Sequence, residues 1–198
     1  MKNIFKILPI LLVSLGCRAQ YPVIDLKQDD GRNAIPDIYL KDMYNVLDPF
    51  VGTYLYTNGN TSLKIILQKK IQAYDGYKYE DLLVGEYRYV ENGVEKVNTL
   101  NDLYNWSDIE QMHSIGANFP LEMGDYLCQG CVANEKRILG GFVDHFTNNH
   151  AQITISKTTV GTQQAINLFI YWQSKGVTVG TTFTYPYIPG GDWVLIKQ

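Results

Sequence analysis

The stretch FVGTYLYTNGNTSLKIILQK, residues 50–69, contains the clearest fold signal in the sequence. Its first part is rich in residues that favour β-strands, and its last part sets Leu63, Ile65 and Leu67 at alternate positions against Lys64 and Gln68. The intervening Asn-Gly-Asn, residues 58–60, supplies turn residues that tolerate positive φ. The stretch therefore predicts a β-hairpin with strands at residues 50–57 and 61–69.

Six further segments carry a strand-forming pattern: residues 80–90, 94–99, 137–146, 151–157, 165–172 and 193–197. Tight turns such as Glu91-Asn92-Gly93 join neighbouring segments, which predicts antiparallel pairing. Eight antiparallel strands can remove their edges by closing. The expected fold class is therefore all-β, an antiparallel eight-stranded barrel. A two-sheet sandwich is the alternative that explains the same pattern.

Two parts of the chain depart from the strand pattern. Residues 37–47 place Ile38, Met43 and Val46 loosely at helical spacing, so one short N-terminal helix is expected before the barrel. Residues 100–135 contain scattered turn residues and little periodicity. A long irregular stretch of this kind indicates either a functional loop or structure that the pattern does not reveal.

The N-terminus has the composition of an export signal. Lys2 and Lys6 precede an aliphatic run over residues 7–15, which is too short to span a bilayer as a helix. Residues 1–19 are therefore predicted to be a signal peptide, followed by an extended arm or tether at 20–36 and a single β-barrel domain at 37–198. The expected location is outside the cytoplasm: the periplasm, the outer membrane surface or the extracellular space.

Cys17 separates two interpretations of how this signal is processed. Gly16-Cys17 resembles the end of a bacterial lipobox, in which the cysteine is acylated and becomes the first mature residue, although Ser14 departs from that pattern. Alternatively, a signal peptidase cuts after Ala19, and the mature chain begins at Gln20. Membrane contact is expected only through a lipid anchor on Cys17.

The other two cysteines form the motif Cys128-Gln129-Gly130-Cys131. In an oxidising compartment a local disulfide between Cys128 and Cys131 is the leading interpretation. Free thiols, a redox motif and a metal site are the alternatives. A redox motif is disfavoured because residues 132–137 show no apolar helical stripe.

The net charge limits the classes of partner. The whole chain carries a net charge of −3, and loss of the three basic residues of the signal region would leave about −6. No basic stripe is present to attract a phosphate backbone, so no nucleic-acid partner is expected.

The chain resembles two groups of proteins. A Gly-x-aromatic strand opening at Gly52 to Tyr54 is similar to the start of lipocalin-like or avidin-like small barrels. Over nearly its full length the chain resembles an uncharacterised family of bacterial secreted or lipoprotein-like proteins, a domain of unknown function. The shared features are Cys17-Arg18-Ala19-Gln20, the opening at Gly52, and a proline-rich closing strand with Pro186, Pro189 and Trp193 to Lys197. This resemblance implies no catalytic residues.

No residue pattern points to catalysis. The chain lacks a Gly-x-Ser-x-Gly elbow, and His113-Ser114 are merely adjacent. Glu86 alternates with apolar neighbours and is expected to face solvent. His145 and His150 flank a turn and are expected to be solvated. We therefore expect no enzyme activity, no metal and no cofactor.

Binding is better motivated, because aromatic rings can line an apolar cavity or stack on sugars. The strand aromatics Tyr54, Tyr87, Tyr89 and Trp172 are the candidate ligand-binding residues. The first hypothesis is an exported envelope protein that binds a small apolar or carbohydrate ligand inside the barrel. The alternative is a structural or protein-interaction module with a filled core, whose binding face lies on the loops around residues 100–135 and whose partner is another envelope protein.

Overall fold

The computed structural model describes residues 22–28, 35–105, 110–125, 128, 131–133, 135–172 and 185–198. Its strands are β1 (Val23–Asp25), β2 (Tyr39–Lys41), β3 (Gly52–Asn58), β4 (Thr61–Tyr74), β5 (Tyr79–Glu91), β6 (Val94–Asn98), β7 (Ile115–Leu121), β8 (Arg137–Asp144), β9 (Asn149–Val160), β10 (Gln163–Trp172) and β11 (Gly191–Lys197). Four short 3₁₀ turns accompany them: η1 (Leu26–Gln28), η2 (Asp48–Phe50), η3 (Leu100–Tyr104) and η4 (Glu110–Met112).

Eight of these strands form a closed antiparallel barrel. Their order is β5, β4, β3, β11, β10, β9, β8, β7, and β7 pairs again with β5 through Leu83 opposite Ala117 and Gly85 opposite Ile115. The predicted all-β, eight-stranded barrel is therefore confirmed, and the open sandwich is excluded because the ladder has no free edge around this ring.

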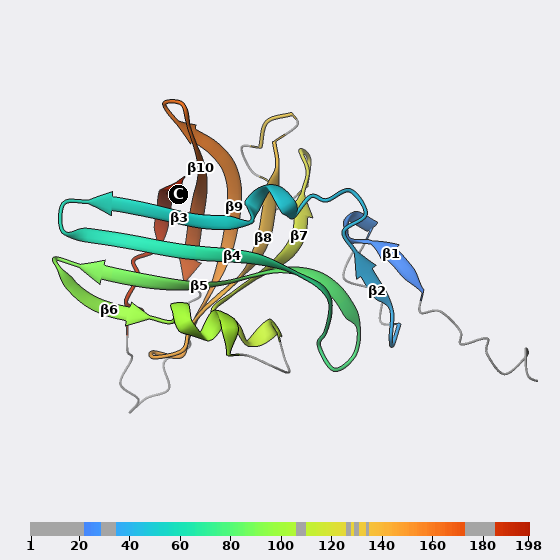
Figure 1. Cartoon of the computed structure of the whole chain (residues 1–198). Helices are drawn as coiled ribbons and strands as arrows, with labels where there is room; N and C mark the ends of the chain where they lie inside the picture. The colour runs from blue at the N-terminus through green and yellow to red at the C-terminus, as the bar shows by residue number, and fades with distance from the viewer. Residues whose placement is uncertain are drawn as a thin grey trace, which may run out of the picture.

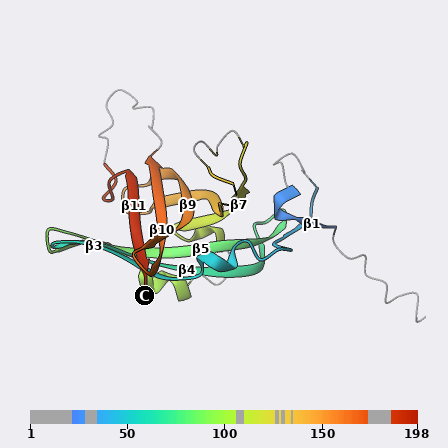
Figure 2. The ribbon, with the colours of Figure 1, turned by 90° about the horizontal axis from the view of Figure 1, so that it is seen from above.

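The barrel is built from two layers that cross steeply. Figure 1 shows β3, β4 and β5 running across the front, with β7 to β10 behind them at a large angle. Seen from above in Figure 2, β9, β10 and β11 stand on the layer formed by β3 to β5. Crossed layers of this kind place the side chains of both inner faces in a single core.

Strand β5 organises the rest of the fold, because three strands use its second edge in succession. β2 pairs in parallel with Tyr79 and Glu80, β7 pairs with residues 83–85, and β6 pairs with residues 88–91. The eight strands expected from the sequence therefore included one wrong member. The segment at 94–99 is β6, which lies off the barrel path, and the missing barrel strand is β7.

Strand β7 lies in the stretch expected to be irregular. Gly116 and Pro120 interrupt its strand pattern, and its pairing with β8 shifts register between Ala117 and Phe119. A bulge of this kind breaks the period-two alternation on which strand prediction depends.

The short helix expected at residues 37–47 is wrong. No α-helix occurs in the parts of the chain that the structure describes, and residues 39–41 form β2 instead. Asp37 and Asn45 have positive φ, at 57° and 52°. The Asp42 carboxylate accepts hydrogen bonds from the backbone N–H groups of Val46 and Leu47, at 2.7 and 3.0 Å. Such side-chain bonds offer the backbone an alternative to helical hydrogen bonds.

The segment predicted as an extended arm contributes structure where it is described. β1 pairs in parallel with β2, and Leu26 is buried. Asp81 holds this region to the barrel by accepting hydrogen bonds from the Tyr39 hydroxyl at 2.6 Å and from the Asp42 N–H at 3.0 Å. The N-terminal strands are thus attached to β5 by a buried polar network as well as by strand pairing.

Candidate functional site

The aromatic residues expected to bind a ligand belong to the core. Tyr54, Tyr87 and Tyr89 are each no more than 2% exposed. The Tyr87 ring lies 4.8 Å from Phe142, and Phe142 meets Trp172 edge-on at 5.6 Å. These rings and the inward-facing aliphatic side chains, among them Leu63, Ile65 and Leu67, form one buried cluster. The four predicted residues are therefore brought together as core packing, with the three tyrosines in the buried cluster and Trp172 partly buried against it.

Two of these tyrosines carry an unusual hydroxyl. The hydroxyl oxygens of Tyr54 and Tyr87 are buried and have no hydrogen-bond partner among the described residues. Burial raises the pKa of Tyr54 to about 12. Burial also raises the pKa of Tyr87, and the nearby charges of Asp144 and Glu86 add to that increase. Both phenols therefore remain neutral at any physiological pH.

A hollow opens at one end of the barrel, with a volume of about 510 Å³. Its apolar floor comes from Phe50, Leu121 and Ile138, all of which are buried. Phe50 ends the turn before β3, Leu121 ends β7 and Ile138 lies near the start of β8, so closure of the barrel brings three distant segments to one opening. We call this feature the end hollow.

Charged side chains surround the end hollow. Lys27 Nζ lies 2.6 Å from Glu122 Oε1, which links the N-terminal segment to the loop after β7. The hydrogen bond to Glu122 raises the pKa of Lys27. Arg137 pairs with Glu135 at 2.7 Å. Lys136 also lines the hollow and is exposed, and it makes no ion pair with any described carboxylate.

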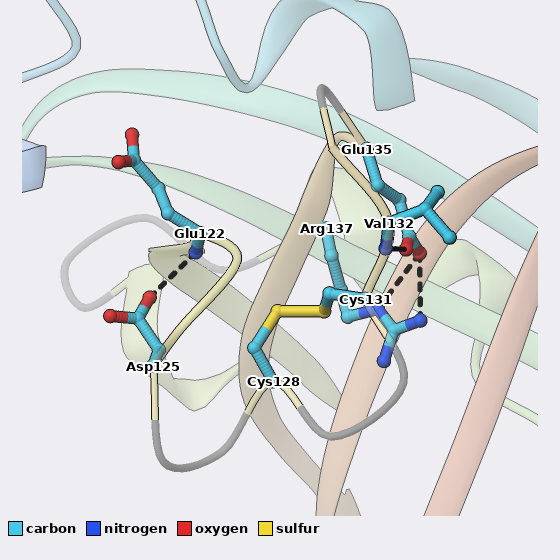
Figure 3. The surroundings of a disulfide bond; sticks show 7 residues. All are labelled: Glu122, Asp125, Cys128, Cys131, Val132, Glu135 and Arg137. Carbon is cyan, nitrogen blue, oxygen red and sulfur yellow. Dashed lines mark hydrogen bonds and ion pairs between the residues drawn. A yellow bond between two sulfur atoms is a disulfide. The ribbon is translucent and has the colours of Figure 1, made fainter.

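The loop between β7 and β8 forms one wall of the end hollow and contains a disulfide (Figure 3). Cys128 and Cys131 are joined, with their Cα atoms 5.4 Å apart. On either side, the Glu122 N–H donates to Asp125 Oδ2 at 2.6 Å and the Val132 N–H donates to Glu135 Oε2 at 3.1 Å. The bond therefore lies among tight turns between β7 and β8, in the same loop as the hollow-lining residues Met123 and Ala133.

A buried polar network lies outside the barrel, beneath η3 and η4. Glu86 is only 1% exposed, so the expectation that it faces solvent is wrong. His113 Nδ1 lies 2.9 Å from Glu86 Oε1, and the Ser114 hydroxyl donates to Glu86 Oε2 at 2.5 Å. Burial alone would raise the pKa of Glu86, but the hydrogen bonds from His113, Ser114 and Thr99 outweigh it and lower that pKa.

This network does not have the geometry of a catalytic triad. Its serine donates to the Glu86 carboxylate and not to the imidazole, so the serine–histidine–carboxylate order of a triad is not formed. Ser114 is also fully buried. The arrangement is that of a satisfied structural network that fixes residues 113–114 against β5.

The model of a family of unknown function, DUF6705, matches residues 1–198. The chain belongs to this family. No curated protein and no solved structure matches the chain.

Family membership of the DUF6705 chain assigns no residue a role, so the candidate site depends on geometry. Within the described residues, no group of three or more His, Cys, Asp or Glu side chains could hold a metal ion. The same residues include no helix with the length and apolar character needed to cross a membrane. Cys17 lies outside the described residues.

The sequence indicated part of the end hollow. Residues 120–123, 133 and 135 belong to the stretch predicted to carry a loop-borne binding face. Phe50 and Ile138 were not singled out, because no local pattern says which strand ends meet at one opening of a barrel. Only the order of strands around the ring brings them together.

Proposed function

We propose that this DUF6705 protein is an exported cell-envelope protein that binds a small ligand at the end hollow of its barrel, with the barrel interior filled by side chains. The observation that carries the proposal is the hollow itself. Its volume of about 510 Å³ falls within the ~300–1,000 Å³ typical of ligand pockets. The signal-like residues 1–19 support export.

The lining suggests the chemistry of the ligand. Buried Phe50, Leu121 and Ile138 would contact an apolar part of it. The Lys27 and Arg137 charges are matched by Glu122 and Glu135, which leaves Lys136 as the cation at the rim that has no described partner. A ligand with an apolar body and a negatively charged or strongly polar group fits this arrangement.

A protein-interaction module is the second candidate, and the filled core favours it over a ligand held inside the barrel. In that case an apolar side chain of an envelope protein would occupy the end hollow. The two candidates differ in the size of the partner, since a small amphipathic molecule should bind by itself only in the first.

The test uses 1-anilinonaphthalene-8-sulfonate, a fluorescent probe with apolar rings and one negative charge. We expect the native protein to bind it saturably, and the Ala133→Trp substitution to weaken binding at least about tenfold, equivalent to ~1.4 kcal/mol. Ala133 lines the end hollow and is exposed, so the larger ring would fill the hollow without entering the core.

The matched control is Val132→Trp. Val132 is the neighbouring residue and is 66% exposed, but it does not line the end hollow. This variant should bind the probe as the native protein does, and near-ultraviolet circular dichroism should show that both variants keep the native tertiary structure. Absence of saturable binding to the native protein, or equal binding by the Ala133→Trp variant, would contradict the proposal.

A further inference from the structure

The outer face of β8 to β11 carries a second hollow, of about 750 Å³. Strand register places its lining in rows that cross the sheet. Phe169 on β10 is opposite Thr154 on β9 and Asp192 on β11, and Tyr171 is opposite Gln152. The alternate residues Leu168 and Ile170 are buried in the barrel, so Phe169 and Tyr171 point outward. We call this feature the outer-face hollow.

Two aromatic rings are exposed in the outer-face hollow. Tyr171 is 61% exposed and Phe169 is 38% exposed, in contrast to the tyrosines inside the barrel. They stand two residues apart on one face of β10, which is one strand repeat. Burying them in the core is impossible in this register, since inward positions on β10 belong to aliphatic residues.

Glycine opens space beside these rings. Gly141 on β8 is opposite Gln152, and a Cβ added there would meet no atom within 4 Å. Gly141, Gln152 and Tyr171 are neighbours across three strands, and the glycine leaves the β8 end of this row without a side chain. A ligand lying over Gln152 could reach the backbone of β8 without steric obstruction.

The wall of the outer-face hollow combines one buried acceptor that lacks a described partner with polar groups at its surface. Asn167 donates through Nδ2 to Asp192 Oδ1 at 3.0 Å, but its own Oδ1 has no hydrogen-bond partner among the described residues. Buried acceptors of this kind are uncommon and call for an explanation. The amide of Gln152 and the hydroxyl of Thr154 add donors and acceptors on the same face.

We propose that the outer-face hollow binds a neutral saccharide, with sugar rings on Tyr171 and Phe169 and sugar hydroxyls paired with Gln152, Thr154 and Asp192. Aromatic faces pack well against the C–H faces of a sugar, and amide, hydroxyl and carboxylate groups suit its hydroxyls. The inference does not depend on the end hollow, since Arg137 is the one described residue that lines both hollows.

The charge of this face disfavours other partners. Among the described residues that line it, Arg137 is the one cation, and it is paired with Glu135, so a polyanion finds no unpaired positive charge on these residues. β8, β9, β10 and β11 are paired on both sides within the barrel. Along β8 and β9 an extended peptide therefore finds no open strand edge to join, and β11 pairs with β3 through Ile196 and Lys197.

The test is calorimetric titration of the mature protein with four neutral hexasaccharides: cellohexaose, xylohexaose, mannohexaose and chitohexaose. We expect at least one to bind, and the Tyr171→Ala substitution to weaken that binding tenfold or more. The control is Tyr104→Ala, which removes a tyrosine that is 73% exposed on η3, away from this face. It should leave binding unchanged.

Two further results decide the proposal. Failure of all four saccharides to bind, or equal binding by the Tyr171→Ala variant, would overturn it. The Ala133→Trp variant should still bind the saccharide, because it alters only the end hollow. Saccharide binding lost in that variant and kept in Tyr171→Ala would place the sugar in the end hollow and also overturn the inference.

Discussion

Residues in the barrel interior combine tight packing with two unpaired polar groups. The Tyr54 and Tyr87 hydroxyls have no hydrogen-bond partner among the described residues, although both tyrosines are fully buried. A buried hydroxyl without a partner costs about 1–3 kcal/mol relative to its hydration in the unfolded chain. Phenylalanine in the same place would keep the ring contacts and remove that cost.

We therefore predict that Tyr87→Phe, and separately Tyr54→Phe, will keep or increase stability, by up to about 1 kcal/mol, in urea unfolding at pH 7. A loss of stability in either variant would contradict this and would indicate that a bound molecule or internal water pairs with the hydroxyl in the native protein. The comparison thus also tests whether the barrel interior is closed to ligands.

The alkaline dependence of stability gives a second measure of the same residues. The pKa of Tyr54 is raised from 10.0 to about 12 by burial, so the folded state favours the neutral phenol. Its contribution is fully present below pH 10 and is lost as the pH rises from there toward 12. The difference in stability between the native protein and Tyr54→Phe should therefore shift in favour of the variant over that range.

The burial of Glu86 is a property of a single residue that the sequence could not reveal. Its position on the outer face of β5 follows from the alternation with buried Gly85 and Tyr87, and that much was predictable. Its burial was not, because it depends on residues 99 and 113–114 folding back over β5. A carboxylate on an outward position is exposed only if nothing covers that face.

Among the elements, β8 shows how closely the barrel strands approach. A Cβ on Gly140 would lie 2.4 Å from the Ala117 Cβ and 2.4 Å from the Gly116 carbonyl oxygen of β7. The neighbouring Gly141 points outward, where a Cβ would meet nothing within 4 Å. The two glycines on one strand therefore have different roles, one in packing and one on the surface.

This pair gives a matched test of barrel closure. Gly140→Ala should lower the free energy of unfolding by about 3 kcal/mol, since the methyl group must displace backbone of β7. Gly141→Ala should be neutral or slightly stabilising, because alanine reduces the entropy of the unfolded chain. Thermal unfolding of both variants measures the difference. Equal stability of the two would contradict the close approach of β7 and β8.

Among the elements, β7 shows what limits the prediction of strands from sequence. Seven of the eight barrel strands overlap segments whose strand pattern is visible in the sequence, although several of them extend beyond the predicted bounds. The sequence does not reveal β7 because a bulge and a proline interrupt its pattern, and it predicts the β6 segment as a barrel strand because that segment's local pattern is equally strand-like. Strand propensity reports local chemistry, whereas membership of the barrel depends on the partner across the sheet.

At the scale of the whole molecule, both the proposed export and the processing of residues 1–19 can be tested by mass spectrometry. We expect the mature protein purified from its native envelope to begin at Cys17 and to carry an acyl adduct there, because a cysteine directly follows the apolar run of the signal region. Intact mass spectrometry measures this. A bare chain beginning at Gln20 would instead indicate cleavage after Ala19.

Cys17→Ser is the control for that measurement. If the thiol is the acylation site, the variant should lose the lipid mass and should no longer partition with membranes, while the barrel remains folded. An unchanged mass difference relative to the sequence would show that any modification lies elsewhere in the chain.

The sequence by itself determined the fold class, because alternation and turn chemistry are local properties that each strand carries in its own residues. It also indicated a local disulfide between the two cysteines of the Cys-Gln-Gly-Cys motif. For residues 100–135 it indicated either a functional loop or structure that the pattern does not reveal. The tertiary structure decided which strands close the ring, which aromatic rings are core and which are surface, and where hollows form. Those properties depend on pairing between residues far apart in the chain, since Phe50, Leu121 and Ile138 become neighbours only when β7 returns to β5.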